Sequence, residues 1–478
     1  ALGLSIGEPL AASAPGEATR RLKAFYAGLG YRGAAVTHSL TTAKDGSISI
    51  AWVVNEGPLY LVKNVNIVGA DTTNDGLVRK AITLAPGDPM RQGGLDTTRR
   101  NLYDIGSFRR VDFDFGDSAI PPAGGGELPL TLTIQGEEPQ RFQLKYGVQF
   151  SVDRSTGKAG GTAFGGSVEL RDRNFIGRAV QASIGAPWDP DLQIIRLLLS
   201  SPRFYGRRVR TNLYARDRRE QDVLDGSTPL EGAMLDDRRL EATFEQRWRP
   251  AATWELVWGY NFSSRRFLID RDDLPATDGL LAGPIASLIL DRRDSAFDAT
   301  RGWFHSSSFQ FGVRSLGSDL GFVRYLLRQS YYQPLGKLTA AGSIRYGTIQ
   351  ASSGPPPIAV IDILFNAGGT TTVRGYPQDS LSAINVAGFA LGGTDLLVLN
   401  GELRFPVSKR LGGAVFVDAG NTFATIGDVR LGRLALGAGL GLRIRTPLAP
   451  LRLDFAHPFS DQYGRHGVRV HFSIGQMF

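Results

Sequence analysis

From about residue 141 to its end, the chain alternates apolar and polar residues with a period of two. Between 142 and 150 every second residue is Phe, Leu, Tyr or Val, and the residues between them are polar or Gly. The same alternation recurs over 254–262 and 434–445. A period of two predicts β-strands with one apolar and one polar face.

The length and ends of these segments distinguish two kinds of β-structure. Soluble β-sandwiches also alternate. Strands of about 9–11 residues, with aromatic residues near their ends and loops rich in Arg and Asp, fit better a barrel whose outside meets lipid and whose inside is wet. At about 20 residues per strand and turn, residues 139–478 hold roughly 16–18 strands; we expect about 16, an even number.

The residues before this region alternate between helical and strand patterns. Apolar residues recur at helical spacing over 17–30, and Gly30 is expected to end that helix. Strands are predicted over 34–41 and 47–55. This stretch looks like the later part of a small module whose beginning is missing.

A second unit of strand, helix, helix, strand, strand follows. The elements are predicted over 59–68, from 75, over 95–104, over 109–115 and over 128–135. This order gives a small α+β module of about 80 residues. The predicted divisions are 1–57 (partial module), 58–138 (module) and 139–478 (barrel).

Composition narrows the class of protein. No stretch approaches the roughly 18 uninterrupted apolar residues of a membrane-spanning helix. The net charge of +8 comes from Arg and Lys interleaved with Asp and Glu, which argues against nucleic-acid binding. The absence of cysteine excludes disulfides and thiol catalysis. The N-terminus lacks the pattern of an export signal, so we expect any such signal to have been removed or to be absent from this sequence.

Residues 365–376 resemble the signature of the outer-membrane-protein assembly superfamily, in which a loop carrying a Val-Arg-Gly-Tyr or Val-Arg-Gly-Phe tip folds back into a barrel. Other segments resemble further strands of that family: 291–294 with 300–302, 400–406, and 416–421. The resemblance implies a transmembrane antiparallel β-barrel preceded by α+β POTRA modules. It also implies an outer-membrane location with the modules in the periplasm.

The resemblance assigns the loop motif Val373, Arg374, Gly375 and Tyr376 to the barrel lumen. It implies that Arg374 pairs with Glu402 and Asp418 there. Spacing makes this pairing possible, because Glu402 falls on the polar face of its strand and an arginine can offer its planar fork to two carboxylates.

The first and last alternating strands, 141–151 and 466–478, must meet if the barrel is to close. We expect this lateral seam to be the working surface. Its candidate residues are Gly147, Gln149, Ser473 and Gly475. A terminal aromatic residue that closes such a strand is characteristic of outer-membrane barrels, and the candidate residues of this C-terminal strand signal are Gly467, Val470, Phe472 and Phe478.

No enzyme, cofactor or metal site is expected. The glycines at 437, 439 and 441 lie on one face of a predicted strand with no helix after them, so they thin or bend the wall instead of forming a nucleotide loop. The five histidines show no metal-ligand spacing, and there is no Gly-x-Ser-x-Gly elbow.

Three activities of the family stay open. The sequences of 365–376 and 440–458 most resemble the barrel subunit of the translocation and assembly module, which assists insertion of barrel and autotransporter proteins. The alternatives are the general barrel-assembly subunit and a two-partner secretion pore; a passive porin ranks last, because it would not need modules. The implied partners are unfolded outer-membrane or autotransporter clients, a periplasm-spanning subunit at the modules, and outer-membrane lipid.

Overall fold

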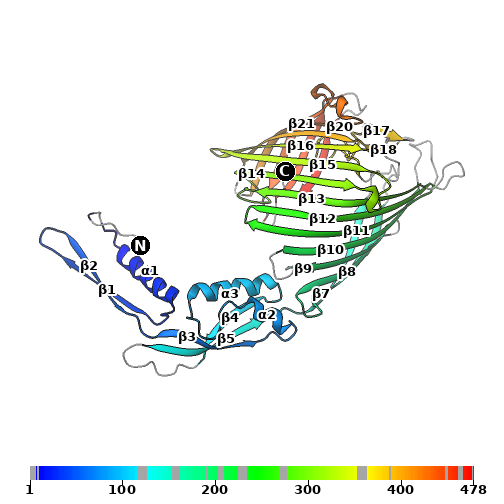
Figure 1. Cartoon of the computed structure of the whole chain (residues 1–478). Coiled ribbons are helices and arrows are strands. Elements are labelled where there is room, and N and C mark those ends of the chain that lie inside the picture. Colours follow the sequence, from blue (N-terminus) through cyan, green and yellow to red (C-terminus); the bar gives the residue numbers. More distant parts are fainter. Residues whose placement is uncertain are drawn as a thin grey trace. The chain divides into compact units, whose positions relative to one another are not determined.

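The fold is described from a computed structural model of the whole chain. It describes all residues except 1–6, 8–9, 117–125, 153–161, 190–191, 203–208, 224–233, 270–276, 353–362, 387–388, 409, 447–449, 461–466, 476 and 478. The chain forms two compact units: residues 1–143 with 171–182 and 201–203, and residues 144–170 with 183–200 and 204–478. Figure 1 shows the elements of both.

The first unit begins with a helix and a hairpin. Helix α1 (Ala14–Leu29) ends at Gly30, whose φ of 110° lies in the left-handed region that glycine adopts at no cost. It is followed by β1 (Ala35–Thr42) and β2 (Ile48–Asn55), which pair antiparallel. The structure has the predicted helix and both predicted strands within a few residues of their expected ends.

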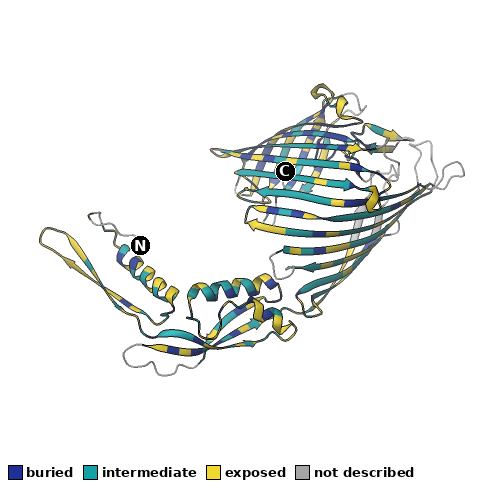
Figure 2. Cartoon of the chain, viewed as in Figure 1, coloured by how far each residue is buried: buried dark blue, intermediate teal, exposed yellow. Residues whose placement is uncertain are grey.

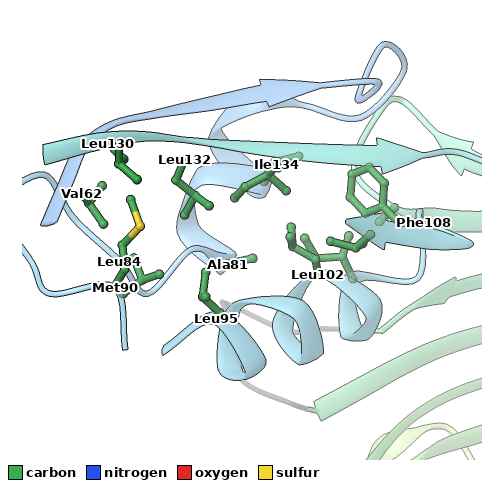
Figure 3. Close-up of a cluster of buried hydrophobic side chains, with 14 of the residues drawn as sticks. Val62, Ala81, Leu84, Met90, Leu95, Leu102, Phe108, Leu130, Leu132 and Ile134 are labelled. Carbon is green, nitrogen blue, oxygen red and sulfur yellow. The ribbon is translucent and has the colours of Figure 1, made fainter. Parts of the chain in front are cut away.

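An α+β module follows this hairpin. Its elements are β3 (Leu59–Val68), α2 (Asp75–Ala81), α3 (Gln92–Ile105), β4 (Arg110–Phe115) and β5 (Glu127–Glu137). The sheet order is β3-β5-β4, with β5 parallel to β3 and antiparallel to β4. Side chains from α3 (Leu95, Leu102) and from β5 (Leu132, Ile134) pack into one core between the helices and the sheet (Figure 3).

Helix α2 depends on a side-chain cap. Asn74 Oδ1 accepts a hydrogen bond from Leu77 N at 3.3 Å. We expect Asn74→Ala to destabilise α2 by about 1 kcal/mol, because a helix-terminal N–H loses its acceptor. Hydrogen exchange of the full chain in detergent should then be about fivefold faster over 75–81. Asp45→Ala, in the β1–β2 turn, is the control; unchanged exchange in α2 would refute the role of the cap.

The second unit is a 16-stranded sheet in which each strand lies beside its neighbours in the chain, apart from β17 and β18. Every strand pair from β10 to β23 is antiparallel. Its strands are β6 (Phe142–Val152), β7 (Thr162–Phe175), β8 (Val180–Trp188), β9 (Leu192–Ser201), β10 (Val209–Val223), β11 (Met234–Ala251), β12 (Trp254–Ile269), β13 (Thr277–Asp291), β14 (Gly302–Gly312), β15 (Phe322–Leu335), β16 (Leu338–Ala351), β19 (Asp395–Pro406), β20 (Leu411–Phe423), β21 (Ala435–Ile444), β22 (Leu451–Pro458) and β23 (Arg469–Ile474).

Short elements lie in the connections of this unit. They are η1 (Arg314–Leu316), η3 (Ile426–Asp428) and η4 (Leu431–Arg433), and the hairpin of β17 (Ile384–Val386) with β18 (Phe389–Gly392). No helix among the described residues is long and apolar enough to cross a membrane.

The alternating apolar and polar residues of the sequence lie on the outer and inner faces of this sheet, respectively. Leu240 and Phe244 of β11 point outward and are 48% and 41% exposed. Glu245, the next residue, points inward and is buried against Asn212 of β10. Figure 2 shows buried and exposed residues mixed along the strands. Exposed apolar side chains on the outer face are what a surrounding lipid requires.

The two ends of the sheet differ from the expectation. Among the described residues, no strand pairing joins β6 to β23, although these strands were expected to meet. The last strand is also shorter than the predicted 466–478: β23 covers Arg469–Ile474, and Gly475 and Met477, the described residues after it, are not in a strand. It ends at Ile474 because Gly475 has a φ of 87°, which breaks the extended conformation.

Candidate functional site

The connection between β16 and β19 is packed against the inner face of the sheet. Phe365, Val373, Tyr376 and Leu381 are each no more than 3% exposed, and they form one apolar cluster with strand residues such as Val398. Thr372 closes the turn inside this loop: its Oγ1 donates to Gly368 O at 2.7 Å and accepts from Gly368 N at 2.8 Å. The loop therefore has a core of its own, which fixes the residues between 368 and 376.

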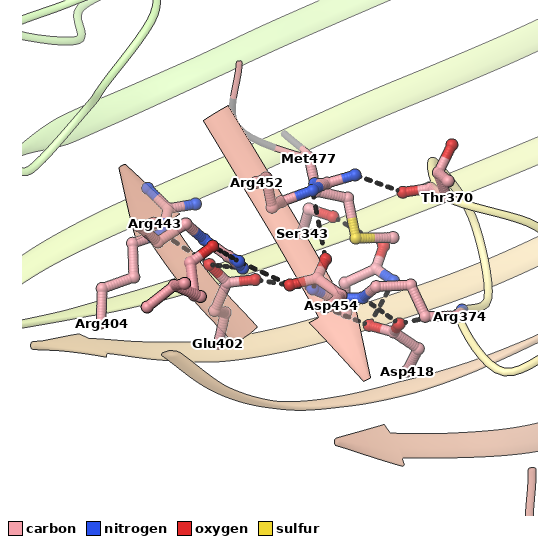
Figure 4. A network of polar contacts seen from close by, with 12 residues as sticks. Ser343, Thr370, Arg374, Glu402, Arg404, Asp418, Arg443, Arg452, Asp454 and Met477 are labelled. Carbon is pink, nitrogen blue, oxygen red and sulfur yellow. Dashed lines mark hydrogen bonds and ion pairs between the residues drawn. The ribbon is translucent and has the colours of Figure 1, made fainter. Parts of the chain in front are cut away.

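Arg374 lies at the tip of this loop and is fully buried (Figure 4). Its Nε and Nη2 donate to the two oxygens of Asp418 at 2.7 and 2.9 Å. Its Nη1 donates to Glu402 at 2.9 Å and to Asp454 at 3.2 Å. The guanidinium carbon lies 3.4 Å from the centroid of the Phe416 ring. One cation thus meets carboxylates from β19, β20 and β22 and an aromatic face from β20, a geometry that only a planar guanidinium satisfies.

Further arginines surround the same carboxylates. Arg404 and Arg443 contact Glu402 at 2.9 and 3.1 Å, and Arg443 also pairs with Asp454. Arg452 contacts Asp454 at 3.1 Å, and its Nη2 donates to Thr370 O at 2.7 Å. The cluster holds four arginines and three carboxylates, all under 9% exposed, and so carries one excess positive charge. Each carboxylate is matched, which is what burial of charge requires.

The residues beside Arg374 bind the remaining strands of this region. Gly375 N donates to Nε2 of His471 on β23 at 3.0 Å. The hydroxyl of Tyr376 donates to Leu436 O on β21 at 2.9 Å. Gly375 has a φ of 97°, which favours glycine at this position. The four-residue motif therefore contacts every strand from β19 to β23.

Gly437 makes the approach of the loop possible. A Cβ added to Gly437 would lie 2.0 Å from the carbonyl oxygen of Arg374. A side chain there would collide with loop backbone, so this glycine keeps the wall thin, as its place in the alternating series predicts.

The structure brings Arg374, Glu402 and Asp418 together as the resemblance implied. The sequence reasoning missed Asp454 and the contact of His471. Asp454 alternates with Leu453 and Phe455, so its parity could have placed it on the inner face. Nothing in its own segment indicates that it meets a residue 80 positions earlier.

The seam candidates lie in or beside the end strands. Gly147 is exposed in β6, and the side chain of Gln149 in the same strand lies outside the described residues. Ser473 is in β23, and Gly475 follows it, with its N donating to Pro450 O at 2.7 Å. The predicted closeness of these four residues stays a prediction.

The strand-signal candidates are placed as follows. Gly467 precedes β23 with a φ of 116°. Val470 and Phe472 are 59% and 64% exposed. Phe478 lies outside the described residues.

Residues 174–478 match the model of the Omp85 superfamily domain. The chain belongs to the Omp85 superfamily. The outer membrane protein assembly factor BamA of Nitratidesulfovibrio vulgaris is 23% identical over 478 residues, covering 96% of this chain and 56% of the relative. The chloroplastic outer envelope protein 80 of Arabidopsis thaliana is 38% identical over 382 residues, covering 75% of this chain and 48% of the relative. The chain thus spans about half the length of these curated relatives.

Solved structures share the Omp85 fold. BamA of Haemophilus ducreyi lacking POTRA domains 1–3 superposes with a TM-score of 0.79 at 15% identity, covering 98% of this chain and 94% of that one. CdiB of Acinetobacter baumannii gives a TM-score of 0.52 at 13% identity, covering 98% and 82%. The 16-stranded sheet accordingly has the fold of an outer-membrane barrel, and the small α+β region before it is of the POTRA type. The BamA relatives in sequence place such a barrel in the outer membrane, with the POTRA-type region in the periplasm.

Proposed function

We propose that this Omp85 protein assists the insertion or secretion of other proteins at the outer membrane, by accepting client strands at the seam between β6 and β23. The observation that carries the proposal is that these two strands end the sheet order and share no pairing among the described residues. Their outward side chains are apolar and strongly exposed: Tyr146 is 84% and Phe472 is 64% exposed.

The physical argument rests on the cost of an open edge in lipid. An unpaired N–H or C=O in the hydrocarbon region costs several kcal/mol, because no water can bind it. A strand edge therefore favours pairing with another strand. An incoming client strand can provide that pairing by β-augmentation, in which main-chain hydrogen bonds supply affinity with little dependence on sequence.

The partners follow from this mechanism. The clients are unfolded outer-membrane or autotransporter proteins, which present alternating strands of the same kind. A periplasm-spanning subunit binds the POTRA-type modules, whose three-stranded sheet ends at β3 and β4. Outer-membrane lipid surrounds the apolar outer face. No step of this mechanism breaks or forms a covalent bond in the client.

The subfamily stays a prediction. The sequences of 365–376 and 440–458 favour the translocation and assembly module type, and the similarity to BamA proteins supports an assembly role in general. A two-partner secretion pore, in which the client passes through the lumen, is the competing function.

A disulfide across the seam tests the proposal. The chain has no cysteine, so Gly147→Cys with Ser473→Cys introduces the sole pair. A bond forms only where the two Cα atoms come within about 7 Å. We expect the oxidised variant in liposomes to insert a denatured barrel client at least about fivefold more slowly, because edge pairing would be blocked. Reductant should restore the rate.

A second cysteine pair is the control. Ser287 and Ser308 are direct partners on β13 and β14, so their cysteine variants cross-link strands that are already paired. This bond should leave insertion unchanged. Full insertion through an efficiently cross-linked seam would refute strand addition there and favour passage through the lumen.

A further inference from the structure

Three arginines stand directly opposite one another on three neighbouring strands. Arg219 of β10 is the register partner of Arg238 of β11, which is the partner of Arg266 of β12. Their side chains are 51%, 65% and 67% exposed. We call these residues the arginine row. Like charges directly opposite each other on a sheet are destabilising unless a counter-charge lies among them.

The arginine row points outward, just past the apolar part of the outer face. On β11, Arg238 shares its face with Leu240 and Phe244, which follow it two and six residues later and are both exposed. Outward residues of an outer-membrane barrel are apolar at the level of the lipid chains and polar at the level of the headgroups. The row therefore stands at headgroup level.

The row lies at the extracellular end of these strands. There β10 joins β11 through residues 224–233, and β12 joins β13 through 270–276. At the opposite end, β11 joins β12 through residues 252–253 alone. In outer-membrane barrels the long connections are extracellular and the short turns are periplasmic. The lipid beside the row is therefore that of the outer leaflet.

Aspartates bind the arginines of the row, and in Arg219 and Arg238 they contact one edge of the guanidinium group, formed by Nε and Nη2. Asp236 accepts from Nε and Nη2 of Arg219 at 3.4 and 2.8 Å. Asp217 accepts from the same two atoms of Arg238 at 3.4 and 3.0 Å. These bonds fix the direction of each guanidinium and do not involve Nη1. Arg266 has a looser contact, 3.8 Å from Asp278.

A groove on the second unit adjoins two of these arginines. It has a volume of about 510 Å³, and its lining includes Trp188, Asp189, Ile195, Asp217, Arg219 and Arg238. Trp188 and Ile195, on the shorter strands β8 and β9, are 48% and 53% exposed. The groove thus joins an exposed apolar part to a polar part in which two guanidinium groups lie beside two aspartates, which suits an amphiphile better than a free ion.

We propose that the arginine row and this groove bind the phosphorylated headgroup of an outer-leaflet lipid, with the first part of an acyl chain against Trp188 and Ile195. The aspartates occupy one edge of each paired guanidinium, and a phosphate would add acceptors at the outward Nη1 edges, where guanidinium binds it in fork geometry. The site is separate from the seam, so it holds whether or not clients enter between β6 and β23.

Native mass spectrometry of the full chain in detergent, with added bis-phosphorylated lipid A, tests the proposal. We expect the triple variant Arg219→Gln, Arg238→Gln, Arg266→Gln to bind lipid A about tenfold more weakly, because each substitution removes a charge-assisted contact. Lipid A without its two phosphates should bind the wild type as weakly as bis-phosphorylated lipid A binds the triple variant. Inorganic phosphate at about 10 mM should not displace lipid A, since it lacks the acyl contact.

A charge-matched variant serves as control. Arg216→Gln, Arg249→Gln, Arg301→Gln removes three exposed arginines that are not part of the row, and it should bind lipid A as the wild type does. Equal binding by the row variant and the wild type, or equal loss in both triple variants, would overturn the proposal. Displacement by inorganic phosphate would overturn the lipid assignment. If the row variant does not fold, Arg238→Gln alone should weaken binding about threefold, and unchanged binding would be equally decisive.

Discussion

Replacing Arg374 with alanine is expected to destabilise the folded barrel by about 3–5 kcal/mol, because breaking a buried ion cluster leaves an uncompensated charge. Most of the cost falls on Asp418. Glu402 keeps Arg404 and Arg443, and Asp454 keeps Arg443 and Arg452. Asp418 receives side-chain bonds from Arg374 at both oxygens and otherwise from Asn400 at 2.9 Å.

Urea unfolding in detergent, followed by tryptophan fluorescence, measures this loss. Arg301→Ala, at an exposed residue before β14, is the control and should change stability by less than about 0.5 kcal/mol. Adding Asp418→Asn to the Arg374→Ala variant removes the stranded charge and should recover part of the loss. Similar unfolding of Arg374→Ala and Arg301→Ala would show that the cluster does not hold the barrel together.

A methyl group at Gly437, on the strand that faces the loop around Arg374, is expected to displace this loop from the inner face of the sheet. The Cβ of Gly437→Ala would meet the carbonyl oxygen of Arg374 at 2.0 Å, and backbone cannot move aside as a flexible side chain can. We expect a loss of about 1–3 kcal/mol from this overpacking. The loop should also become accessible, with faster hydrogen exchange over 368–376.

Gly432→Ala provides the matched control for this substitution. A Cβ at Gly432 meets nothing within 4 Å, so the same chemical change is made in open space. It should leave both stability and exchange near the wild-type values. Protection of 368–376 that is equal in the two variants would mean that the loop does not rest on Gly437.

The elements of the fold follow closely from local patterns. The strand expected over 59–68 is β3, and helix 95–104 lies inside α3. Strand 141–151 differs from β6 by one residue at each end. These elements could be predicted because their periods of 3.6 and 2 are local properties of the chain.

The lengths of the middle strands could not be predicted in this way. Strand β11 has 18 residues, well beyond the expected 9–11. Its additional residues form ion pairs with the neighbouring strand, as Arg238 of β11 does with Asp217 of β10 at 3.0 Å. Such pairing extends a strand past the membrane where apolar alternation has already ended, so the pattern alone gives no signal of it.

The partners of Arg374 were predictable only in part. Glu402 and Asp418 come from the resemblance, which covers their segments. Asp454 is 80 residues from Arg374, and His471, which accepts from Gly375 N, is 96 residues from Gly375. Only the packing of the last strands against the loop brings these residues together. The alternation of a strand predicts which face of the sheet a side chain lies on, but it does not predict which residues along the strand the loop contacts.

The loop around Arg374 has a mechanical consequence for the barrel. Through Glu402, Asp418, Leu436, Asp454 and His471 it fastens five consecutive strands to one rigid point. A wall braced in this way should resist bending from β19 to β23. If β6 and β23 separate further, we therefore expect the strands on the β6 side to move while those from β19 to β23 keep their arrangement.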